Sequence, residues 1–427
     1  MKLRTMAVVV LGVGALAGVG CKKKPKEGKA PEGSGSATMS GTGAASGAGS
    51  AGSAAEPPKE AKLEGKALAD KYLECVGMIS GSKWDDFKSK CLAKDYKGHE
   101  ADGREIPNAD AVVEFFKGQY TAFPDMKMQP QLVFVNGRNI LAVGLLTGTH
   151  TGPLKTPMGE VPATNKKIGM LMFHRVAISD DNRAAEEWAY SDPATMASQL
   201  GLLPKEAQPL RAAMDKGLDG APIVVIAADD DKEKKNVDAV KKAAAAMASH
   251  KIADIMATWA DDGLESDQAE AKDWKGKKEL QAATETLLKG FPDLKTTGEP
   301  AYYAAGDYVV MMGVYEGTNS GPLGKMKATN KKVSGQFAEV IEVKDGKIAK
   351  LWRFRNGMAM AMQLGLMPEP KPAGGAGSAA GSAAGSAAPK GDAPKGDAPK
   401  GDAPKGDAPK GDKKDAPKAD KKDDAKK

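Results

Sequence analysis

Apolar positions in the middle of the chain change from a helical spacing to alternation, and the same change occurs twice. They recur every three or four positions in three stretches, 64–78, 84–92 and 109–122. Alternating or continuous apolar runs follow at 131–135, 140–147, 167–178 and 184–190, and predict strands. Helical spacing returns at 237–259 and 277–289. Helices followed by antiparallel strands predict an α+β fold, with the helices covering one face of a curved sheet.

Turn residues mark the ends of several predicted elements. Ser179-Asp180-Asp181-Asn182 separates two predicted strands, as Lys344-Asp345-Gly346-Lys347 does later, and both predict hairpins. Gly201 and Gly365 stand where a short final helix needs a left-handed C-cap. Asn165 is expected in a turn, because Asn tolerates the left-handed conformation.

Four short motifs occur twice in the same order, with partners about 165 residues apart. They are 123–126 with 291–294, 148–154 with 317–323, 163–167 with 328–332, and 199–202 with 363–366. This order predicts the tandem duplication of a domain-sized unit. We place the first unit at 63–206, a linker at 207–235 and the second unit at 236–370.

The N-terminus is typical of an exported protein. Lys2 and Arg4 precede an apolar run, 6–20, that is shorter than the roughly 20 residues a bilayer span needs. A small residue directly before Cys21, with a Lys-rich stretch after it, resembles the lipobox of bacterial lipoproteins. The resemblance implies that 1–21 form a lipoprotein signal peptide and that lipidated Cys21 anchors the protein to a membrane. An ordinary secretory signal is the alternative.

Under the lipoprotein interpretation the protein lies in the cell envelope, at the outer membrane or the periplasmic face; Lys22 favours outer-membrane sorting. Residues 22–62 are rich in Lys, Pro, Gly, Ser and Ala, and predict a disordered tether. Residues 371–427 form a low-complexity tail in which Pro-Lys-Gly-Asp occurs five times from Pro389. The tail is either inert and solvated or a weak contact with anionic envelope polymers.

The net charge of +6 comes from the two ends, and residues 64–388 carry a net charge of −2. The middle of the chain therefore lacks the concentrated basic surface that nucleic acids require, and no nucleic-acid partner is expected. Cys75 and Cys91 can form a disulfide in an exported protein or remain buried thiols. Neither has a His or an acid nearby at zinc-ligand spacing, so no metal site is expected.

Five motifs of the first unit together resemble the SnoaL-like polyketide cyclase or ester cyclase family, which belongs to the nuclear transport factor 2-like superfamily of α+β cones. They are Gly-Thr-His-Thr-Gly-Pro at 148–153, Thr-Asn-Lys-Lys at 164–167, Met-Phe-His-Arg at 172–175, Glu-Glu-Trp at 186–188 and Gln-Leu-Gly at 199–201. The resemblance covers 63–204 and, more loosely, 236–368. It implies two tandem cone-shaped domains. It does not single out one function, because the superfamily includes enzymes, binding proteins and scaffolds.

In these cyclases an acid on the last strand exchanges protons in an apolar pocket, beside a histidine. By position, the resemblance implies Asp192 as the acid and His174 as the histidine, with His150 lining the pocket and His99 at its mouth. Such a reaction needs no cofactor and no metal.

Side-chain parity bears on the same site, because Trp188, Tyr190 and Asp192 alternate along one strand and share a face. If this face lines the cone, Trp188 and Tyr190 contact a ligand and burial raises the pKa of Asp192. Structural alternatives exist. Asp192 precedes a helix and is a candidate N-cap, His174 is a candidate core residue, and His150 lies in a Gly-rich turn.

The second unit is predicted to be degenerate and non-catalytic, because its candidate positions carry other residues. By motif alignment, Asn319, Ala338 and Asn356 replace His150, His174 and Asp192, and Asp267 falls roughly opposite His99.

Two classes of function follow. The first is a membrane-tethered binding protein for a small apolar ligand, or a pair of cones packed as an intramolecular pseudo-dimer that binds an envelope partner. The alternative is a cyclase, isomerase or dehydratase in the first unit, with Asp192 as general acid–base and His174 assisting.

Overall fold

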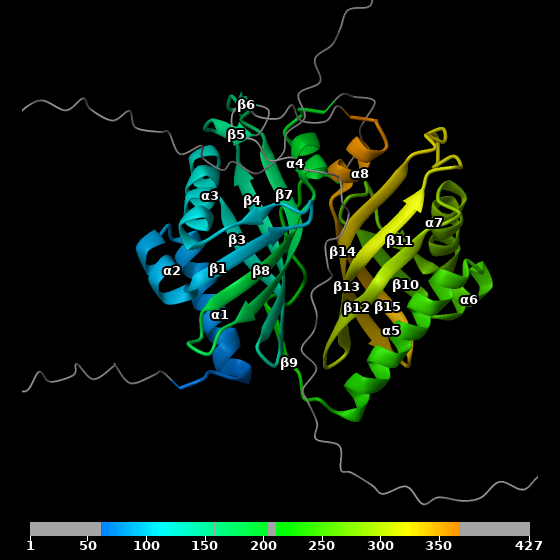
Figure 1. Ribbon diagram of the computed structural model, residues 1–427, viewed down its shortest axis with the longest axis horizontal. Helices are drawn as coiled ribbons and strands as arrows, with labels where there is room; N and C mark the ends of the chain where they lie inside the picture. The colour runs from blue at the N-terminus through cyan, green and yellow to red at the C-terminus, as the bar shows by residue number, and fades with distance from the viewer. Residues whose placement is uncertain (1–60, 157–158, 204–210, 368–427) are drawn as a thin grey trace, which may run out of the picture. The chain divides into compact units, whose positions relative to one another are not determined.

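The computed structural model describes residues 61–156, 159–203 and 211–367, and within them two α+β repeats follow one another (Figure 1). The first repeat contains α1 (Gly65–Ser80), α2 (Trp84–Cys91), β1 (Leu92–Glu100), β2 (Glu105–Ile106), α3 (Ala109–Ala122), β3 (Lys127–Asn136), β4 (Asn139–Thr149), β5 (Leu154–Thr156), β6 (Gly159–Val161), β7 (Lys167–Ile178), β8 (Ala184–Tyr190) and α4 (Pro193–Gln199). After β9 (Ile223–Ile226), the second contains α5 (Asp231–Ser249), α6 (Ile252–Ala257), β10 (Trp259–Asp267), β11 (Trp274–Lys275), α7 (Gly276–Gly290), β12 (Lys295–Ala305), β13 (Tyr308–Thr318), β14 (Lys332–Lys344), β15 (Lys347–Arg355) and α8 (Gly357–Gln363). The predicted α+β duplication is confirmed.

The predicted signal peptide with Cys21, the C-terminal tail, and all of the tether except residues 61 and 62 lie outside the described residues. Among the residues that are described, no helix is both long and apolar enough to cross a membrane.

The two large sheets have the same order of equivalent strands, and the first sheet has β9 as an additional edge strand. The first is ordered β2-β1-β8-β7-β4-β3-β9 and the second β11-β10-β15-β14-β13-β12. The pairs are antiparallel apart from β1 with β8, β10 with β15 and β3 with β9. Strand β9 comes from the predicted linker and extends the edge of the first sheet, so part of that linker is sheet structure.

The turn chemistry predicted from Asn and Gly is confirmed. Asn165, Asn182, Gly201 and Gly365 all have positive φ, between 55° and 73°. The single helix predicted over 237–259 is wrong, because α5 ends where His250 turns left-handed with φ of 57° and α6 begins afterwards. Strands β1 and β10 were not predicted, because they are polar and gain their hydrogen bonds from partners about 90 residues away.

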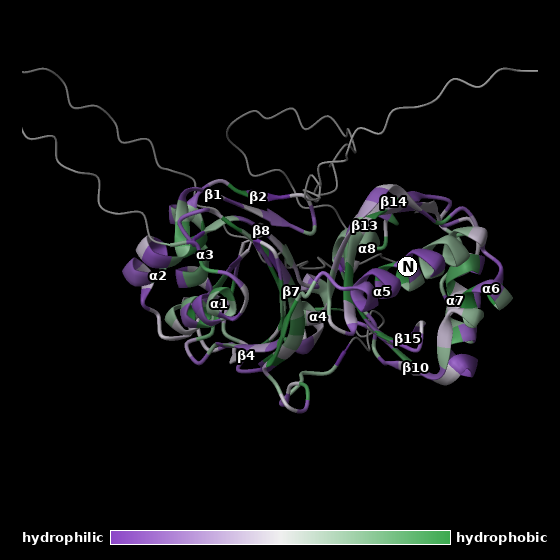
Figure 2. Ribbon diagram, turned by 90° about the horizontal axis from the view of Figure 1, so that it is seen from below, coloured by the Kyte–Doolittle hydropathy of each residue, from purple (hydrophilic) through white to green (hydrophobic). Residues whose placement is uncertain are grey.

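Helices cover one face of each large sheet (Figures 1 and 2). In the first repeat, α1, α2 and α3 cover the face that carries Val133, Ala142 and Val176. We call the space between these helices and this sheet face the cone interior. On the opposite face, side chains of both repeats join one hydrophobic cluster, in which Phe173 packs 5.7 Å from Phe354 between ring centroids.

Candidate functional site

A small cavity of about 60 Å³ lies in the cone interior of the first repeat. Its wall is mainly apolar and includes Leu68, Tyr72, Val76, Phe87, Phe116 and Val176. His174 and Glu187 are also in the wall. Of the residues predicted to catalyse or to contact a ligand, only His174 lines this cavity.

Tyr96, Glu187 and His174 form a hydrogen-bonded chain from three neighbouring strands, β1, β8 and β7. His174 Nδ1 lies 2.5 Å from Glu187 Oε1. Tyr96 Oη donates to Glu187 Oε2 over 2.8 Å. Gly98 pairs with Glu187 and leaves room for the phenol, since a Cβ at Gly98 would lie 3.1 Å from Tyr96 Oη. His174 is 6% exposed, and its Nε2 has no hydrogen-bond partner among the described residues.

The environment sets the charge of these groups. Burial alone would raise the pKa of the Glu187 carboxyl, but the hydrogen bond and charge of His174 and the hydrogen bond from Tyr96 lower it below its ordinary value. Burial, followed by the charge of Glu187, places the pKa of Tyr96 well above its ordinary value. On the same strand, burial raises the pKa of Glu100 to about 7, with repulsion from Asp102 and Glu187 adding to the shift and Arg104 opposing it. At neutral pH this region holds a carboxylate, a neutral phenol and a partly protonated carboxyl.

The prediction that Trp188 and Tyr190 face the cone interior is wrong. They share a face as expected, but they belong to the cluster on the opposite face, together with residues of the second repeat such as Tyr303. Glu187 points the other way, toward the helices. Alternation determines which residues share a face of a strand, whereas the packing of the two sheets determines what covers that face.

His99 also lies outside the cone interior, contrary to its predicted place at a pocket mouth. Its ring stacks on Trp188 with the centroids 5.0 Å apart, and its Nε2 lies 2.8 Å from Glu186 Oε1. The Arg175 guanidinium lies 4.1 Å from the centroid of the Trp188 ring and 5.3 Å from that of Tyr303 in the second repeat. His99 and Trp188 therefore form part of a stacked cluster between the repeats.

Asp192 caps α4. Its carboxylate accepts hydrogen bonds from Ala194 N, Thr195 N, Thr195 Oγ1 and, from the second repeat, Gly357 N. It is 1% exposed, and burial raises its pKa. In the described part of the chain, Asp192 and His174 share no hydrogen bond or ion pair. The structure does not bring the predicted acid and histidine together.

His150 is fully buried and holds a turn. Its Nδ1 accepts from Thr164 N over 3.2 Å, and its ring packs against Phe123. Burial lowers its pKa. In the second repeat, Asn319 Oδ1 accepts from Thr329 N over 2.8 Å. His150 and Asn319 therefore do the same structural work, as their motif alignment suggested.

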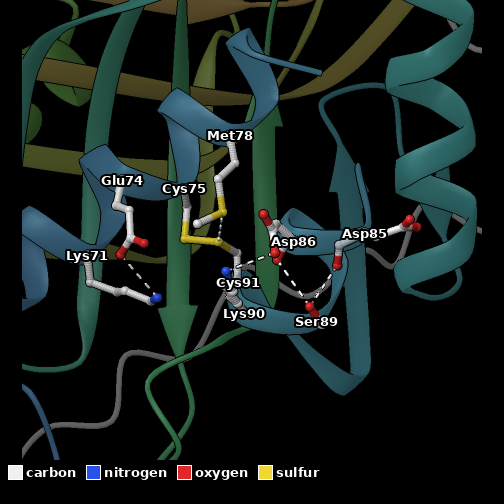
Figure 3. Close-up of a disulfide and its surroundings, with 9 residues drawn as sticks. All are labelled: Lys71, Glu74, Cys75, Met78, Asp85, Asp86, Ser89, Lys90 and Cys91. Carbon is white, nitrogen blue, oxygen red and sulfur yellow. Dashed lines mark hydrogen bonds and ion pairs between the residues drawn. A yellow bond between two sulfur atoms is a disulfide. The ribbon is translucent and has the colours of Figure 1, made fainter. Parts of the chain in front are cut away.

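Cys75 of α1 and Cys91 of α2 are joined by a disulfide (Figure 3). The sulfur of Met78 lies 3.7 Å from Cys91 Sγ. Both cysteines line the cavity, so the bond connects two helices that enclose it. No group of three or more metal-ligating side chains occurs within the described ranges.

The predicted replacement of His174 by Ala338 is wrong by one position. The ladders of β7 and β14 begin at Lys167 and Lys332, and His174 and Glu339 each lie seven residues further along. The alignment through the tryptophans failed because five residues separate the paired Ile178 and Ala184, whereas four separate the paired Val343 and Ile348.

Asp267 likewise corresponds to Glu100 and not to His99. Glu100 pairs with Ala189, as Asp267 pairs with Arg353. Asp267 is 3% exposed.

The helix-covered face of the second sheet therefore retains acids, among them Glu339 at the position equivalent to His174. They are engaged by arginines. Arg353 donates to Glu339 Oε1 over 2.7 Å and to Glu265 Oε1 over 2.5 Å. Arg355 Nε donates to Asp267 Oδ2 over 2.8 Å. Ion pairing leaves these carboxylates less available for a ligand than His174 Nε2 is in the first repeat, where no described residue bonds it.

Comparison with known proteins agrees with the fold. The family model for SnoaL-like polyketide cyclase matches residues 66–200 and 237–364, which together are more than half of the chain. The chain belongs to the SnoaL-like polyketide cyclase family. Each match coincides with one repeat, so both repeats are SnoaL-like domains.

Solved structures of single SnoaL-like or related domains align with parts of the chain. An NTF2-like protein from Burkholderia xenovorans LB400 is 21% identical, covers 31% of this chain and 97% of its own, and gives a TM-score of 0.27. IdmH from Streptomyces antibioticus, a proposed polyketide cyclase, is 23% identical to this chain. The alignment covers 31% of this chain and 98% of IdmH, with a TM-score of 0.28. No curated protein matches the chain.

Sequence reasoning found His174 but missed Glu187 and Tyr96. The alternation that placed Trp188 and Tyr190 on one face also places Glu187 on the other. An acid on the strand face opposite Trp188 and Tyr190 was a usable signal. Tyr96 could not be found in this way, because β1 was not predicted to be a strand.

Proposed function

We propose that the first SnoaL-like domain binds a small ligand inside its cone. The observation that carries this proposal is the buried His174, which lines a mainly apolar cavity and whose Nε2 has no hydrogen-bond partner in the part of the chain that the structure describes. Buried polar atoms normally have a hydrogen-bond partner. A ligand that fills the cavity would supply one.

The second domain suggests a substitution that should fill the cavity of the first. Ala184 pairs with Leu92, whereas at the equivalent positions Ile348 pairs with Trp259. Ala184 lines the cavity. Replacing it with Ile, the residue of the second domain, should fill much of the space, at an overpacking cost of about 1–3 kcal/mol.

The test is ligand capture by the full chain, using native mass spectrometry and thermal shift with a library of small compounds. Wild-type protein should bind members of the library, and Ala184→Ile should bind them at least about tenfold more weakly. Val340→Ile, on the opposite face of the second sheet, is the control and should bind like wild type. Absence of any bound compound, or equal binding by Ala184→Ile, would reject the cavity as the site.

A second candidate is proton-transfer catalysis in the same cone, and a separate observation favours it. A carboxyl with a pKa of about 7, at Glu100, supplies both protonation states at neutral pH. His174, oriented by Glu187, is the base in this scheme. Deuterium uptake from solvent by small ketones should occur with wild type and disappear with His174→Phe. If Asp192→Asn abolished uptake and His174→Phe did not, Asp192 would be the base instead.

We also propose that the protein acts in the cell envelope, anchored through lipidated Cys21. The leader pattern supports this, and so does the Cys75–Cys91 disulfide, because structural disulfides persist mainly in oxidising compartments. Metabolic labelling with a fatty acid should label the wild type and not Cys21→Ser. Label retained by Cys21→Ser would exclude this anchor.

The two domains are further proposed to act as an intramolecular pseudo-dimer. Support comes from the hydrophobic cluster that both domains share and from the bond that Gly357 N donates to Asp192 over 3.0 Å.

A further inference from the structure

The hydrogen bonds around His174 determine which atom the ring offers to a ligand. Both oxygens of Glu187 act as acceptors, one for Tyr96 Oη and one for His174 Nδ1. Nδ1 must therefore carry the hydrogen in this pair. When the ring is neutral, Nε2 then presents a lone pair and can only accept; the charged ring, which helps to lower the pKa of Glu187, has no lone pair to offer.

Among the described residues none donates a hydrogen bond to Nε2, although Lys71, Tyr72 and Asn182 also line the cavity. Its wall is mainly apolar and includes Val76 of α1, Phe87 of α2 and Val176 of β7. A buried acceptor without a partner costs free energy, and a ligand hydroxyl removes that cost by donating to it.

Charge narrows the choice among ligands. Glu187 is a carboxylate and Glu100 lies close enough to interact with it, so a ligand anion would be repelled. An ammonium group would lose its hydration on entering, and the mainly apolar wall offers too few acceptors to replace it. An uncharged donor satisfies Nε2 without either penalty.

We propose that the cone of the first domain binds a small, neutral hydroxyl compound, an alcohol or a phenol, whose O–H donates to His174 Nε2. This rests on the proposed function, since it names the ligand class of the same site. Glu187 and Tyr96 are positioning residues that hold the tautomer. A volume of about 60 Å³ holds the bulk of roughly two waters, so the ligand, or the part of it that enters, has only a few non-hydrogen atoms.

The experiment uses the full chain labelled with ¹⁵N-histidine, which gives a simple spectrum because there are only four His residues. The probes share one carbon skeleton: 1-propanol, 1-chloropropane, propylamine and propionate. 1-Propanol should shift the His174 Nε2 resonance saturably, and the other three should bind at least about tenfold more weakly. The Kd is expected to be no tighter than tens of micromolar, given the size of the probe.

His174→Phe keeps a ring and removes the acceptor, so it should lose the preference for 1-propanol over 1-chloropropane. Binding by this variant is followed by line broadening of the probe. His150→Asn, the other buried histidine, is the matched control and should keep the preference. Equal binding of 1-propanol and 1-chloropropane, or tighter binding of propionate or propylamine, would overturn the ligand class while leaving a ligand site. Binding of no probe and no library compound would overturn the proposed function itself.

Discussion

His150 and His174 are both buried imidazoles, and their neighbours give them different roles. Nδ1 of His150 accepts from a backbone N–H, whereas Nδ1 of His174 meets a carboxylate. The first arrangement holds a turn. The second leaves Nε2 without a partner among the described residues, in a side chain that lines a cavity.

His150→Asn should preserve the first domain, because Asn319 already performs this role in the second. We expect a loss in the free energy of unfolding below about 1 kcal/mol, against about 1–3 kcal/mol for His150→Ala, which leaves Thr164 N without its acceptor. Since burial lowers the pKa of His150, wild-type stability is fully present above the ordinary value of 6.5 and falls as pH drops through the lowered pKa. Urea unfolding from pH 7 to pH 4 should show this extra loss in wild type and not in His150→Asn. A larger loss in the Asn variant would contradict the turn role.

Glu100 should have the opposite effect to His150, because it lowers the free energy of unfolding as pH rises. Its pKa is raised from the ordinary 4.5 to about 7, so the folded state favours the protonated carboxyl and loses stability as pH rises between those values. Glu100→Gln removes this loss and should gain on wild type from pH 4.5 to pH 7, with no further gain above. Urea midpoints at pH 4, 6 and 8 test this. Glu105→Gln, an exposed acid on the adjacent β2, is the control. Parallel curves for wild type and Glu100→Gln would refute the raised pKa.

Among the elements, α1 and α2 enclose the cavity and are connected by the disulfide. The helix α2 has only eight residues, and its other contacts are mostly aromatic side chains against α3, such as Phe87 with Phe116. An isolated helix of this length is not stable. The disulfide therefore contributes strongly to keeping the cavity closed on that side.

Replacing both Cys75 and Cys91 with Ser should lower the free energy of unfolding by about 3 kcal/mol, the value expected for closing a loop of this length. The cysteines are 16 positions apart. Urea unfolding of wild type in a reductant should show the same decrease, and the double variant should not respond to the reductant. Unchanged wild-type stability in reductant would show that the bond contributes nothing to stability.

For the molecule as a whole, the cluster on the opposite faces of the sheets couples the two domains. Phe354 of the second domain is 1% exposed and packs against Phe173 of the first. Ile341 is equally buried but packs on the helix-covered face of its own sheet. The two positions therefore separate coupling between domains from stability within one domain.

Phe354→Ala should cost about 3–5 kcal/mol and speed amide exchange in β4 of the first domain. Ile341→Ala should destabilise the second domain and leave exchange in β4 near the wild-type rate. Hydrogen exchange followed by mass spectrometry measures both. Slow exchange in β4 of Phe354→Ala would show that the domains are energetically independent.

The sequence by itself determined the duplication, the α+β order and the turns, because these follow from local spacing and from the few residues that tolerate positive φ. It also identified His174 and the pair Cys75 and Cys91 as candidates. It could not determine which face of β8 meets the helices, since alternation is identical for either choice.

Only the tertiary structure decided that Trp188 packs between the domains while Glu187 meets His174 and Tyr96. Strand β1 depends on hydrogen bonds with β8, about 90 residues away, and the residue equivalent to His174 depends on the lengths of the turns after β7 and β14; local patterns report neither. The sequence therefore predicted only part of the candidate site. Its histidine lay in a predicted strand, but the carboxylate and the phenol that orient it are brought there by long-range pairing.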